Sequence, residues 1–579
     1  MTTELHSIRH TLAHLLAAAV NEHYPDAIPT IGPAIDNGFY YDFDNLTIGD
    51  KDLSKIEQTM RDSLALWTAW ERNEVSADEA RTHFAKNPYK LELIDELARE
   101  GSTITLYTCG GFTDLCRGGH SENPARDIDP ASFKLDRVAG AYWRGDEHNT
   151  MLTRVYGLAF ETPEKLKAYE EGRELAKERD HKKLGRELDL FLFSDLVGPG
   201  LPLFTPKGTL LRDLLDGFVW ELRSQKGYQR VDIAHLTKKD LYERSGHWDK
   251  FGDELFKIQT REGHEFVVKP MNCPHHTQIF DRKKHSYREM PQRYANTTKV
   301  YRDEQTGELA GLTRVRSITQ DDAHVFCRYE QVKDEMGAIW DIIDTFYGAF
   351  GFTLTPTLSL HDPKEPDKYL GDESVWLKAE NRLRELAADR GVVVEECVGE
   401  AAFYGPKIDF LATDALDRTH QVATIQLDMN MPERFDLTCI NETGAEERIV
   451  MIHAAIMGSV ERFMGPLIEH FGGAFPTWLS PVQVTVLPIA EAHRDYAHEL
   501  EKQLRAANIR TELDYSNNGL GKKIRNWKMS KTPYAIVIGD NEVSDTTVTL
   551  EHRSGTKETL SLEALLKKLT EEIETRALN

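Results

Sequence analysis

Long strand-like runs occupy the middle of the chain, and their spacing most constrains the fold. Five lie between residues 188 and 480: Glu265–Pro270, Thr297–Glu304, Leu312–Cys327, Ala401–Thr413 and His420–Asn430. Parallel strands need a crossover connection, usually a helix, so a doubly wound fold shows regular strand–helix alternation. These runs are irregularly spaced and lack that alternation. We therefore predict a mostly antiparallel sheet with helices packed around it.

The segments before and after this predicted sheet have different patterns of apolar and polar residues. Residues 1–160 combine an amphipathic helix over about 5–22 with strand-period segments such as Thr103–Cys109. The last part does alternate: strand 482–489, helix 492–507, strand 511–515, helix 521–531, strand 534–539, then another strand and a closing helix. We predict an α+β protein whose last part, 481–579, is a small α/β domain.

A charged stretch connects the first part to the sheet. Thr162 can cap a helix whose first position is Pro163, and few apolar residues follow before residue 187. So little apolar surface is typical of a solvated connecting helix. The predicted organisation is therefore residues 1–160, a linker helix over 161–187, then 188–480 and 481–579.

Length, charge and cysteine content exclude several classes of protein. The 579 residues suggest about four domains, and 40% hydrophobic with 29% charged residues excludes disordered or collagenous chains. The net charge of −24 leaves only local patches for nucleic acid. Six cysteines without paired short spacings do not suggest a disulfide framework. No signal peptide or membrane span is readable, so we expect a cytoplasmic protein.

No glycine-rich phosphate loop is present, so charged side chains must hold the phosphates of any nucleotide. The chain contains neither G-x-x-x-x-G-K-[ST] nor a G-x-G-x-x-G after a strand. Guanidinium groups can grip phosphate with two hydrogen bonds, and the candidates are Arg302, Arg314, Arg316 and Arg462. On a strand, Arg302 and Glu304 would point to the same face. For any single arginine, an ordinary surface salt bridge is the usual alternative.

One histidine and cysteine set lies in the first part of the chain. His10 and His14 are four residues apart, so a helix presents them on one face. Cys116 and His120 complete the raw ligand inventory of a zinc site. The same groups could instead position and deprotonate a water for hydrolysis, with Asp114 and Lys90 as polar helpers. The remaining alternative is that these residues are unrelated.

A second set consists of Cys273, His324 and His453. Three protein ligands with a free fourth position is the pattern of a catalytic zinc, which leaves room for water or substrate. The three residues lie far apart in the sequence, so their spacing alone is weak support for a metal site.

Several short strings together resemble class II aminoacyl-tRNA synthetases. Tyr301–Glu304 resembles motif 2 and Gly458–Arg462 resembles motif 3 of that class. Three more strings narrow the resemblance to threonyl-tRNA synthetases: Met271–Pro274, Gln320–His324 and Phe403–Asp409. His10 and His14, Cys116–His120 and Ala139–Gly145 resemble that family's editing domain. The resemblance spans essentially the whole chain.

This resemblance implies a fold and a reaction. It implies a class II catalytic domain at 188–480, an editing domain at 1–160 and an anticodon-binding domain at 481–579. Such enzymes activate L-threonine with Mg²⁺-ATP to threonyl-adenylate, then transfer the threonyl group to the terminal adenosine of tRNA(Thr). Class II membership also implies a homodimer.

The resemblance also assigns roles to residues. One zinc ion per subunit would be bound by Cys273, His324 and His453, and threonine would be held by Asp322, Tyr404 and Gln426. The α-phosphate would be contacted by the catalytic residues Arg302 and Lys407, adenine by Glu304, and the outer phosphates by Arg314 and Arg462, the latter also catalytic. Gln320 and Ser459 complete the ATP-binding set. Asn517 and Glu542 match anticodon-binding positions.

Two sites are expected because the zinc site cannot reject serine. A metal that demands a hydroxyl ligand excludes valine, but one missing methyl group is worth only about 1–3 kcal/mol. A hydrolytic site acting on seryl-tRNA(Thr) is the remedy, formed by His10, His14, Lys90, Asp114, Cys116 and His120. The ligand inventory permits a metal there, whereas the family resemblance favours metal-free hydrolysis, which we expect.

Four departures from the family pattern are visible. The N-terminal ubiquitin-like (TGS) domain of many members is not expected, because the editing motif begins within ten residues of Met1. Ala234 stands where motif 1 would have proline, and Ala310 replaces a frequent histidine in the motif 2 loop. His275 stands in a glycine position beside Cys273 and adds a rival metal ligand.

A cationic stretch lies in the last part of the chain. Lys528–Thr532 mimics the lysine-rich loop of class I synthetases, but no His-x-Gly-His partner occurs. The stretch contains Lys522, Lys523, Arg525, Lys528 and Lys531, with Trp527 among them. On an acidic protein it predicts a local RNA-contacting face, with a solvated helix face as the alternative.

Two rival functions remain. Another class II synthetase, such as a prolyl or seryl enzyme, is disfavoured by the Cys273, His324 and His453 set. A non-catalytic tRNA-binding paralogue would be expected to lose motif arginines or metal ligands, and Arg302 and Arg462 are present.

Overall fold

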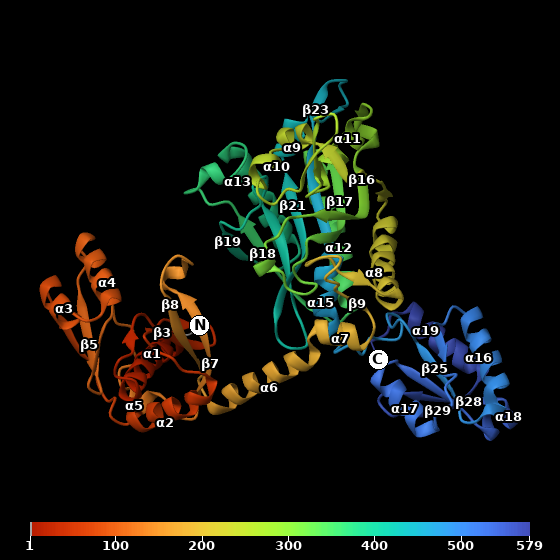
Figure 1. The fold of residues 1–579 in the computed structure, drawn as a ribbon. Coiled ribbons are helices and arrows are strands. Elements are labelled where there is room, and N and C mark those ends of the chain that lie inside the picture. The colour runs from red at the N-terminus through yellow and green to blue at the C-terminus, as the bar shows by residue number, and fades with distance from the viewer. Residues whose placement is uncertain (1–2, 579) are drawn as a thin grey trace. The chain divides into compact units, whose positions relative to one another are not determined.

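The computed structural model describes residues 3–578. The chain divides into two compact units, Met1–Glu174 and Leu175–Asn579. Figure 1 shows the order of their helices and strands. Among the described residues, no helix combines the length and apolar character that crossing a bilayer would require.

The first unit is built around helix α1 (Thr3–His23), which confirms the helix predicted over about 5–22. Its residues Leu12, Leu15 and Leu16 are fully buried. One sheet has the order β1–β3–β8–β7, with β2 beside β3. Its strands are β1 (Ile28–Pro29), β2 (Ala34–Ile35), β3 (Gly38–Asp44), β7 (Phe133–Tyr142) and β8 (Met151–Ala159).

A smaller sheet completes this unit, in the order β4–β5–β6. Its strands are β4 (Glu71–Glu74), β5 (Thr105–Cys109) and β6 (Phe112–Leu115), so the strand predicted near Thr103–Cys109 is present. The other helices are α2 (Leu53–Leu64), α3 (Ala77–His83), α4 (Pro88–Arg99) and α5 (Pro124–Asp127). Helix α1 contacts both β3 and β6, which places its side chains against both sheets.

The helix predicted over 163–187 is interrupted at Asp180. Helix α6 (Pro163–Arg179) buries only Leu166 among its residues, as expected of a solvated helix. Helix α7 (His181–Glu187) then begins anew, with the Asp180 carboxylate accepting from the Lys182 backbone N–H at 2.7 Å. Buried residues of α7 include His181 and Leu184, so the prediction of a single solvated helix is wrong for this last part.

The second unit contains an eight-stranded sheet of order β11–β16–β17–β24–β21–β20–β18–β19. Its strands are β11 (Gln229–Arg230), β16 (Gln292–Tyr301), β17 (Ser317–Cys327), β18 (Thr353–Leu360), β19 (Glu395–Val398), β20 (Lys407–Thr413), β21 (Thr419–Asp428) and β24 (Val450–Ser459). The five inner pairings are antiparallel and the two edge pairings are parallel. The predicted mostly antiparallel sheet is therefore confirmed.

Helices cover this sheet and supply its core. They are α8 (Pro206–Gln225), α12 (Val332–Gly348), α13 (Glu373–Asp389) and α15 (Val460–His470). Apolar residues of α12 recur at helical spacing: Ile339, Ile343 and Phe346 are at most 1% exposed and belong to one core cluster. Helix α15 follows β24 directly and contacts both β17 and β24 (Figure 1).

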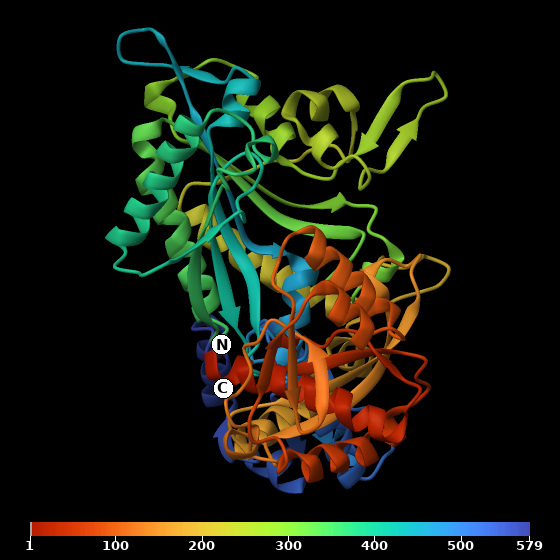
Figure 2. The same ribbon diagram turned by 90° about the vertical axis from the view of Figure 1, so that its left-hand side faces the viewer.

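Shorter elements lie around the large sheet. They are α9 (Lys239–Ser245), α10 (His247–Lys250), α11 (Cys273–Asp281), α14 (Asn430–Arg434), β9 (Phe191–Leu192), β10 (Leu203–Phe204), β12 (Leu236–Lys238), β13 (Lys257–Gln259), β14 (Glu265–Val268), β15 (His285–Ser286), β22 (Thr438–Ile440) and β23 (Glu446–Arg448). The turn between β22 and β23 projects at the top of both ribbon views (Figures 1 and 2).

The predicted strand runs differ from the observed strands at their ends. The run Glu265–Pro270 forms β14 in a separate sheet with β12 and β13. Strand β16 ends at Tyr301, so Arg302 and Glu304 lie beyond it, and the prediction that both lie on one strand is wrong. The Arg302 N–H instead donates to the Arg316 carbonyl at 3.1 Å.

The last part forms a five-stranded sheet of order β26–β25–β27–β28–β29. Its elements are β25 (Val484–Pro488), α16 (Arg494–Ala506), β26 (Thr511–Leu513), α17 (Leu520–Met529), β27 (Tyr534–Ile538), α18 (Asp540–Asp545), β28 (Thr547–His552), β29 (Lys557–Ser561) and α19 (Leu562–Glu574). The alternation was predicted, but α18 was missed and two antiparallel strands replace the single last strand.

Candidate functional sites

The predicted metal ligands Cys273, His324 and His453 converge on one side of the large sheet. They come from the start of α11, from β17 and from β24, and their ligand atoms lie within 4.8 Å of one another. His324 Nε2 and His453 Nδ1 are 3.0 Å apart. All three side chains are buried. The chain thus brings together one sulfur and two nitrogen donors, the ligand types that Zn²⁺ prefers.

A carboxylate orients one of these histidines. Asp428 Oδ2 lies 2.9 Å from His453 Nε2, and Asp428 Oδ1 accepts from the backbone N–H groups of Asn430 and Met431. A ligand histidine commonly donates its second ring N–H to a carboxylate, which fixes its tautomer. Burial raises the pKa of the Cys273 thiol well above its usual value. A cation would be needed to hold it as a thiolate, so the donor set fits zinc.

The candidate threonine ligands lie next to this cluster. Tyr404 stacks on His453 with ring centroids 4.8 Å apart, and its hydroxyl donates to Gln426 Oε1 at 2.5 Å. Asp322 accepts a hydrogen bond from Asn272 Nδ2 at 3.0 Å, and burial raises the pKa of its carboxyl. The structure therefore brings all three predicted residues together around the cluster.

A cavity of about 500 Å³ lies along the same sheet. Six predicted ATP-binding residues line it: Arg302, Glu304, Arg314, Gln320, Ser459 and Arg462. The remaining predicted phosphate contact, Lys407, is not among the lining residues; its Nζ lies 2.6 Å from Asp409 Oδ2. The cavity is thus lined by three guanidinium groups that come from different segments of the chain.

Arg302 is half-buried, and one of its buried N–H groups has no partner among the described residues. One of its terminal nitrogens lies 3.3 Å from the Met271 sulfur, and its Nε has no hydrogen-bond partner among residues 3–578. Burial lowers the pKa of this guanidinium below its usual value. An anionic ligand in the cavity would supply the missing acceptor.

The cavity is bordered by a break in the ladder between β17 and β24. Gln320 pairs with Ser459 and Asp322 pairs with Ala455, so β24 carries extra residues here. The Asp321 carboxylate accepts from the N–H groups of Ile456 at 3.0 Å and Met457 at 2.8 Å. A fully buried Arg223–Asp321 ion pair at 2.9 Å neutralises the carboxylate. Asp321 thus replaces the partners that the ladder does not supply.

The first unit brings its own predicted site residues together. His10, His14, Cys116 and His120 have ligand-type atoms within 4.8 Å of one another. Cys116 Sγ lies 3.2 Å from His120 Nε2 and 3.5 Å from His10 Nε2. The two histidines of α1 share one helix face, as their spacing predicted, with their Nε2 atoms 3.3 Å apart.

Asp114 contacts this cluster through His14, and Lys90 contacts Asp114. Lys90 Nζ lies 2.5 Å from Asp114 Oδ1, while Asp114 Oδ2 lies 3.0 Å from His14 Nδ1 and accepts from the Tyr41 hydroxyl at 2.5 Å. Burial alone would raise the pKa of Asp114, but Lys90 and His14 hold it well below its usual value. The carboxylate is therefore a permanent anion that orients His14.

The same electrostatics produce a thiolate. Burial opposes ionisation of Cys116, but hydrogen bonds from His10, His120 and His14 lower the pKa of the thiol to about 3. Burial likewise opposes protonation of His14, yet Asp114 and Cys116 raise its pKa to about 9. These shifts favour an imidazolium at His14 beside a thiolate at Cys116, an arrangement suited to proton transfer.

Two family descriptions match this chain. The class II core domain of tRNA synthetases (G, H, P, S and T) matches residues 256–471, and an anticodon binding domain matches residues 483–572. The threonine–tRNA ligase of Rubrobacter xylanophilus is 47% identical over 577 residues, covering 99% of this chain and 89% of that protein. The chain belongs to the threonine–tRNA ligase family. The Gloeobacter violaceus ligase is 46% identical, covering 99% of this chain and 93% of its own length.

Solved structures agree with this membership. A chain described as the RNA binding domain of the threonyl-tRNA synthetase from Cryptosporidium parvum is 38% identical, with a TM-score of 0.65 over 68% of this chain and 98% of that one. A Giardia lamblia prolyl-tRNA synthetase, 14% identical with a TM-score of 0.56 over 70% of this chain and 80% of that one, shares the fold alone. The chain is a class II tRNA synthetase, as the motifs implied, because its core matches the class II core-domain description.

The cationic stretch of the ligase does not form a single face. Helix α17 buries Lys523 and Trp527. Lys523 Nζ donates to the Pro488 carbonyl at 3.0 Å, and Lys531 Nζ donates to the Gly472 carbonyl at 2.5 Å. Only Lys522, Arg525 and Lys528 are exposed, so the predicted RNA-contacting face is reduced to these three cations.

The two candidate anticodon residues of the ligase lie in different surroundings. Asn517 is exposed in the loop before α17, and its side-chain oxygen accepts from Arg494 at 2.6 Å. Glu542 lies in α18, where its carboxylate accepts from the Gly539 N–H at 2.9 Å and the Thr549 hydroxyl at 2.8 Å. Asn517 can therefore face a ligand more directly than Glu542.

Sequence reasoning assigned no role to several residues that support these sites. Asp428, Asp321 and Tyr41 act as described above. His247 Nε2 lies 3.5 Å from Cys273 Sγ, and Trp70 stacks on His120 with centroids 3.9 Å apart. His247 was within reach of the sequence, since it lies in the string Ser245–Trp248, within the region of about 215–250 that resembles motif 1 of the class; the others have no local signal.

Proposed function

We propose that this chain attaches L-threonine to tRNA(Thr) through threonyl-adenylate and hydrolyses mischarged seryl-tRNA(Thr). The observation that supports this most directly is the position of two sites on one sheet face. Residues two apart on a strand share a face and lie about 6.6–6.8 Å apart. Gln320 of the arginine-lined cavity is two residues from Asp322, and His324 follows two residues further along β17. Nucleotide and amino acid would therefore meet side by side.

The first step needs mainly positioning and charge stabilisation. A threonine carboxylate oxygen attacks the α-phosphorus of ATP, the new P–O bond forms and pyrophosphate leaves. We assign the α-phosphate to Arg302 and Lys407, adenine to Glu304, and the outer phosphates to Arg314 and Arg462. Fixed cations in a cavity stabilise charge spread over phosphoryl oxygens without reorganising during the reaction. In the second step a ribose hydroxyl of the terminal adenosine attacks the carbonyl carbon and AMP leaves.

Zinc would be held by Cys273, His324 and His453, one ion per chain. When bound, it would offer ligand positions to the amino and hydroxyl groups of threonine and so exclude valine. Asp322, Tyr404 and Gln426 then hold the rest of the amino acid. Mg²⁺ would accompany ATP and balance its phosphate charge. The Asp428 carboxylate supports this assignment, because it leaves His453 Nδ1 free to face the cluster.

Editing is proposed to be metal-free hydrolysis in the first unit. Asp114 and Lys90 orient His14, and His10, Cys116 and His120 surround the place where the seryl ester would lie. A water gives one proton to a ring nitrogen of the cluster and attacks the ester carbonyl carbon, the ester C–O bond breaks, and the leaving ribose oxygen takes a proton from a protonated ring. The Asp114 carboxylate stays ionised and orients His14, while the ring nitrogens of His10, His14 and His120, at 3.2–3.5 Å from one another or from Cys116 Sγ, supply the needed proton relays.

Two further partners are proposed: the anticodon arm of the tRNA, bound by residues 481–579, and a second copy of the chain, as class II membership implies. Asn517, Glu542 and the exposed cations Lys522, Arg525 and Lys528 would contact the anticodon arm of the tRNA. The enzyme is proposed to act as a cytoplasmic homodimer.

The first experiment is amino-acid-dependent ATP–pyrophosphate exchange with threonine, serine and valine. We expect strong exchange with threonine, weaker exchange with serine and none with valine. Chelation of zinc should abolish exchange, and added Zn²⁺ should restore it. Folded, zinc-loaded protein that exchanges with none of the three would overturn the activation proposal.

A second experiment separates editing from activation. Cys116→Ala should leave threonine-dependent exchange unchanged but lower the rate of seryl-tRNA(Thr) hydrolysis. Metal analysis should give one zinc per chain; two would contradict metal-free editing. Equal hydrolysis by Cys116→Ala and the unmodified enzyme would remove Cys116 from the site.

A further inference from the structure

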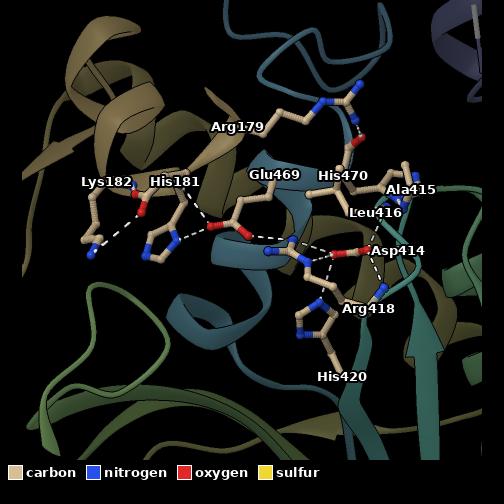
Figure 3. Close-up of polar contacts among 11 residues, drawn as sticks. Arg179, His181, Lys182, Asp414, Ala415, Leu416, Arg418, His420, Glu469 and His470 are labelled. Carbon is tan, nitrogen blue, oxygen red and sulfur yellow. Dashed lines mark hydrogen bonds and ion pairs between the residues drawn. The ribbon is translucent and has the colours of Figure 1, made fainter. Parts of the chain in front are cut away.

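His181, the first residue of α7, joins three separated segments of the second unit. Its ring Nδ1 and its backbone N–H both contact Glu469 Oε1, at 2.6 and 3.0 Å, near the end of α15. Its ring Nε2 accepts from the backbone N–H of Leu312 at 3.0 Å, in the motif 2 loop. Figure 3 shows His181 pointing toward Glu469, and Glu469 toward Arg418. A buried ring with a partner on each nitrogen is held in one orientation.

These contacts fix the tautomer of the ring. A backbone N–H can only donate, so Nε2 of His181 must be unprotonated to accept from Leu312. The proton therefore lies on Nδ1, where it is donated to the Glu469 carboxylate. The neutral ring is an adaptor between an anion and a backbone donor.

A network behind Glu469 keeps that carboxylate ionised and in place. Arg418 contacts Glu469 Oε2 at 2.6 Å and Asp414 Oδ2 at 2.6 Å, and His420 Nε2 contacts the same Asp414 oxygen at 2.9 Å (Figure 3). Burial alone would raise the pKa of Glu469, but hydrogen bonds from His181 and the charge of Arg418 lower it. Asp180, His181 and Glu469 could hold a metal by distance, yet each already has a protein partner.

The Leu312 amide is the link to the nucleotide cavity. Gly311 has a φ of +53°, and a Cβ built on it would lie 2.3 Å from His181 Nε2, so the loop backbone approaches the ring closely. Two residues after Leu312, Arg314 bonds Glu304 Oε2 at 2.8 Å. A second cavity of about 550 Å³, lined by His181, shares six residues with the first: Thr313, Arg314, Gln421, Val422, Met457 and Arg462.

We propose that His181 is a positioning residue for ATP, which holds the motif 2 loop by its Leu312 amide so that Arg314 and Glu304 face the nucleotide. The linker helix thereby takes part in forming the ATP site. The proposal rests on the proposed function, because it takes the cavity to be an ATP site. His181 touches neither substrate in this scheme; it acts through the loop.

Two substitutions separate the contacts of the ring. His181→Asn places an amide near Nδ1 and keeps the Glu469 contact, but nothing reaches Leu312. His181→Gln can present an oxygen near Nε2 and keeps an acceptor for Leu312. Lys183→Ala, an exposed site on the same helix, is the matched control.

The assay is threonine-dependent ATP–pyrophosphate exchange, with KM for ATP, KM for threonine and kcat measured separately. An amide left without its acceptor makes the loop state less favourable, so His181→Asn should raise KM for ATP about tenfold. The KM for threonine should stay unchanged, and kcat should stay within about twofold, because uniform binding is lost. His181→Gln and Lys183→Ala should resemble the unmodified enzyme.

The outcomes decide between positioning and general stabilisation. An unchanged KM for ATP in His181→Asn, or equal increases in the Asn and Gln variants, would overturn the proposal. If His181→Asn does not fold, Glu469→Gln gives the second test, with a KM for ATP about threefold higher; no increase overturns the proposal. Calorimetric binding of ATP separates the two hypotheses: an enzyme without exchange that still binds ATP, more weakly after His181→Asn, would refute only the proposed function.

Discussion

The substitution Lys90→Met removes the cation nearest the buried Asp114 carboxylate. Both side chains are 3% exposed and their charged atoms lie 2.5 Å apart. Removing one partner of a buried pair costs about 3–5 kcal/mol, because the other charge stays buried. His14, whose pKa is raised to about 9, still faces Asp114 as a cation. The loss should therefore lie near the lower limit, at about 3 kcal/mol for the first unit.

Hydrogen exchange of α1 and β3 amides in the full chain is the appropriate assay, since it reports the opening of this unit alone. Lys86→Met, at an exposed position four residues earlier, is the control and should change stability by no more than about 0.5 kcal/mol. The double variant Lys90→Met with Asp114→Asn leaves no unpaired carboxylate, so it should lose less than the single variant.

The direction in which the stability of the first unit changes with pH can be tested in the same experiment. The pKa of Asp114 is lower in the folded state than in the unfolded chain. Its contribution is therefore present above about pH 4 and is lost as the pH falls, and Lys90→Met should weaken this dependence. A loss below about 1 kcal/mol, equal to that of the control, would refute the view that Lys90 compensates the buried charge.

Three further outcomes are expected. Cys116, with its pKa lowered to about 3, should react with iodoacetamide at a rate that stays constant from about pH 5 to pH 8. Cys109, whose pKa is raised, should react faster as the pH rises. Mass spectrometry of the labelled peptides tests this, and parallel pH profiles of the two cysteines would contradict it. His324→Ala should reduce bound zinc from one ion per chain to a small fraction, measured by emission spectrometry, while Lys364→Ala, an exposed control, retains it. Arg223→Met should lower the free energy of unfolding of the second unit by about 3–5 kcal/mol in urea denaturation, because Asp321 is then buried without its cation; an unchanged midpoint would remove that pair from the account.

The fold was readable where one local pattern settles an element. Period-two runs located the long strands, and the lack of helices between them indicated antiparallel pairing. The same reasoning failed at strand ends. Residues such as Arg302 leave the ladder because the chain turns toward the Arg316 carbonyl, which is a long-range event in the sequence.

The residues of the candidate sites likewise divide into those with a local sequence signal and those without one. The candidate metal ligands were predicted because their short strings resemble those of a known family, and the structure brings their side chains together. The role of Asp321 was not predicted, since its carboxylate accepts from the N–H of Met457, which is 136 residues away in the sequence. The fate of the cationic stretch was within reach: Lys523 and Trp527 are four residues apart, so a helix places them on one face, and that face is buried.

The break in the ladder between β17 and β24 has a consequence for the effects of amino-acid substitutions in this enzyme. The cavity is lined by Gln320 of β17 and by Ala455, Met457, Gly458 and Ser459 of β24, so it borders the place where these two strands depart from regular pairing. One carboxylate, Asp321, supplies the acceptors for the displaced strand. A survey that scores substitutions by growth should rank this position with the substrate-binding residues, although its side chain is fully buried. Sensitivity to mutation will therefore extend to residues that no substrate reaches.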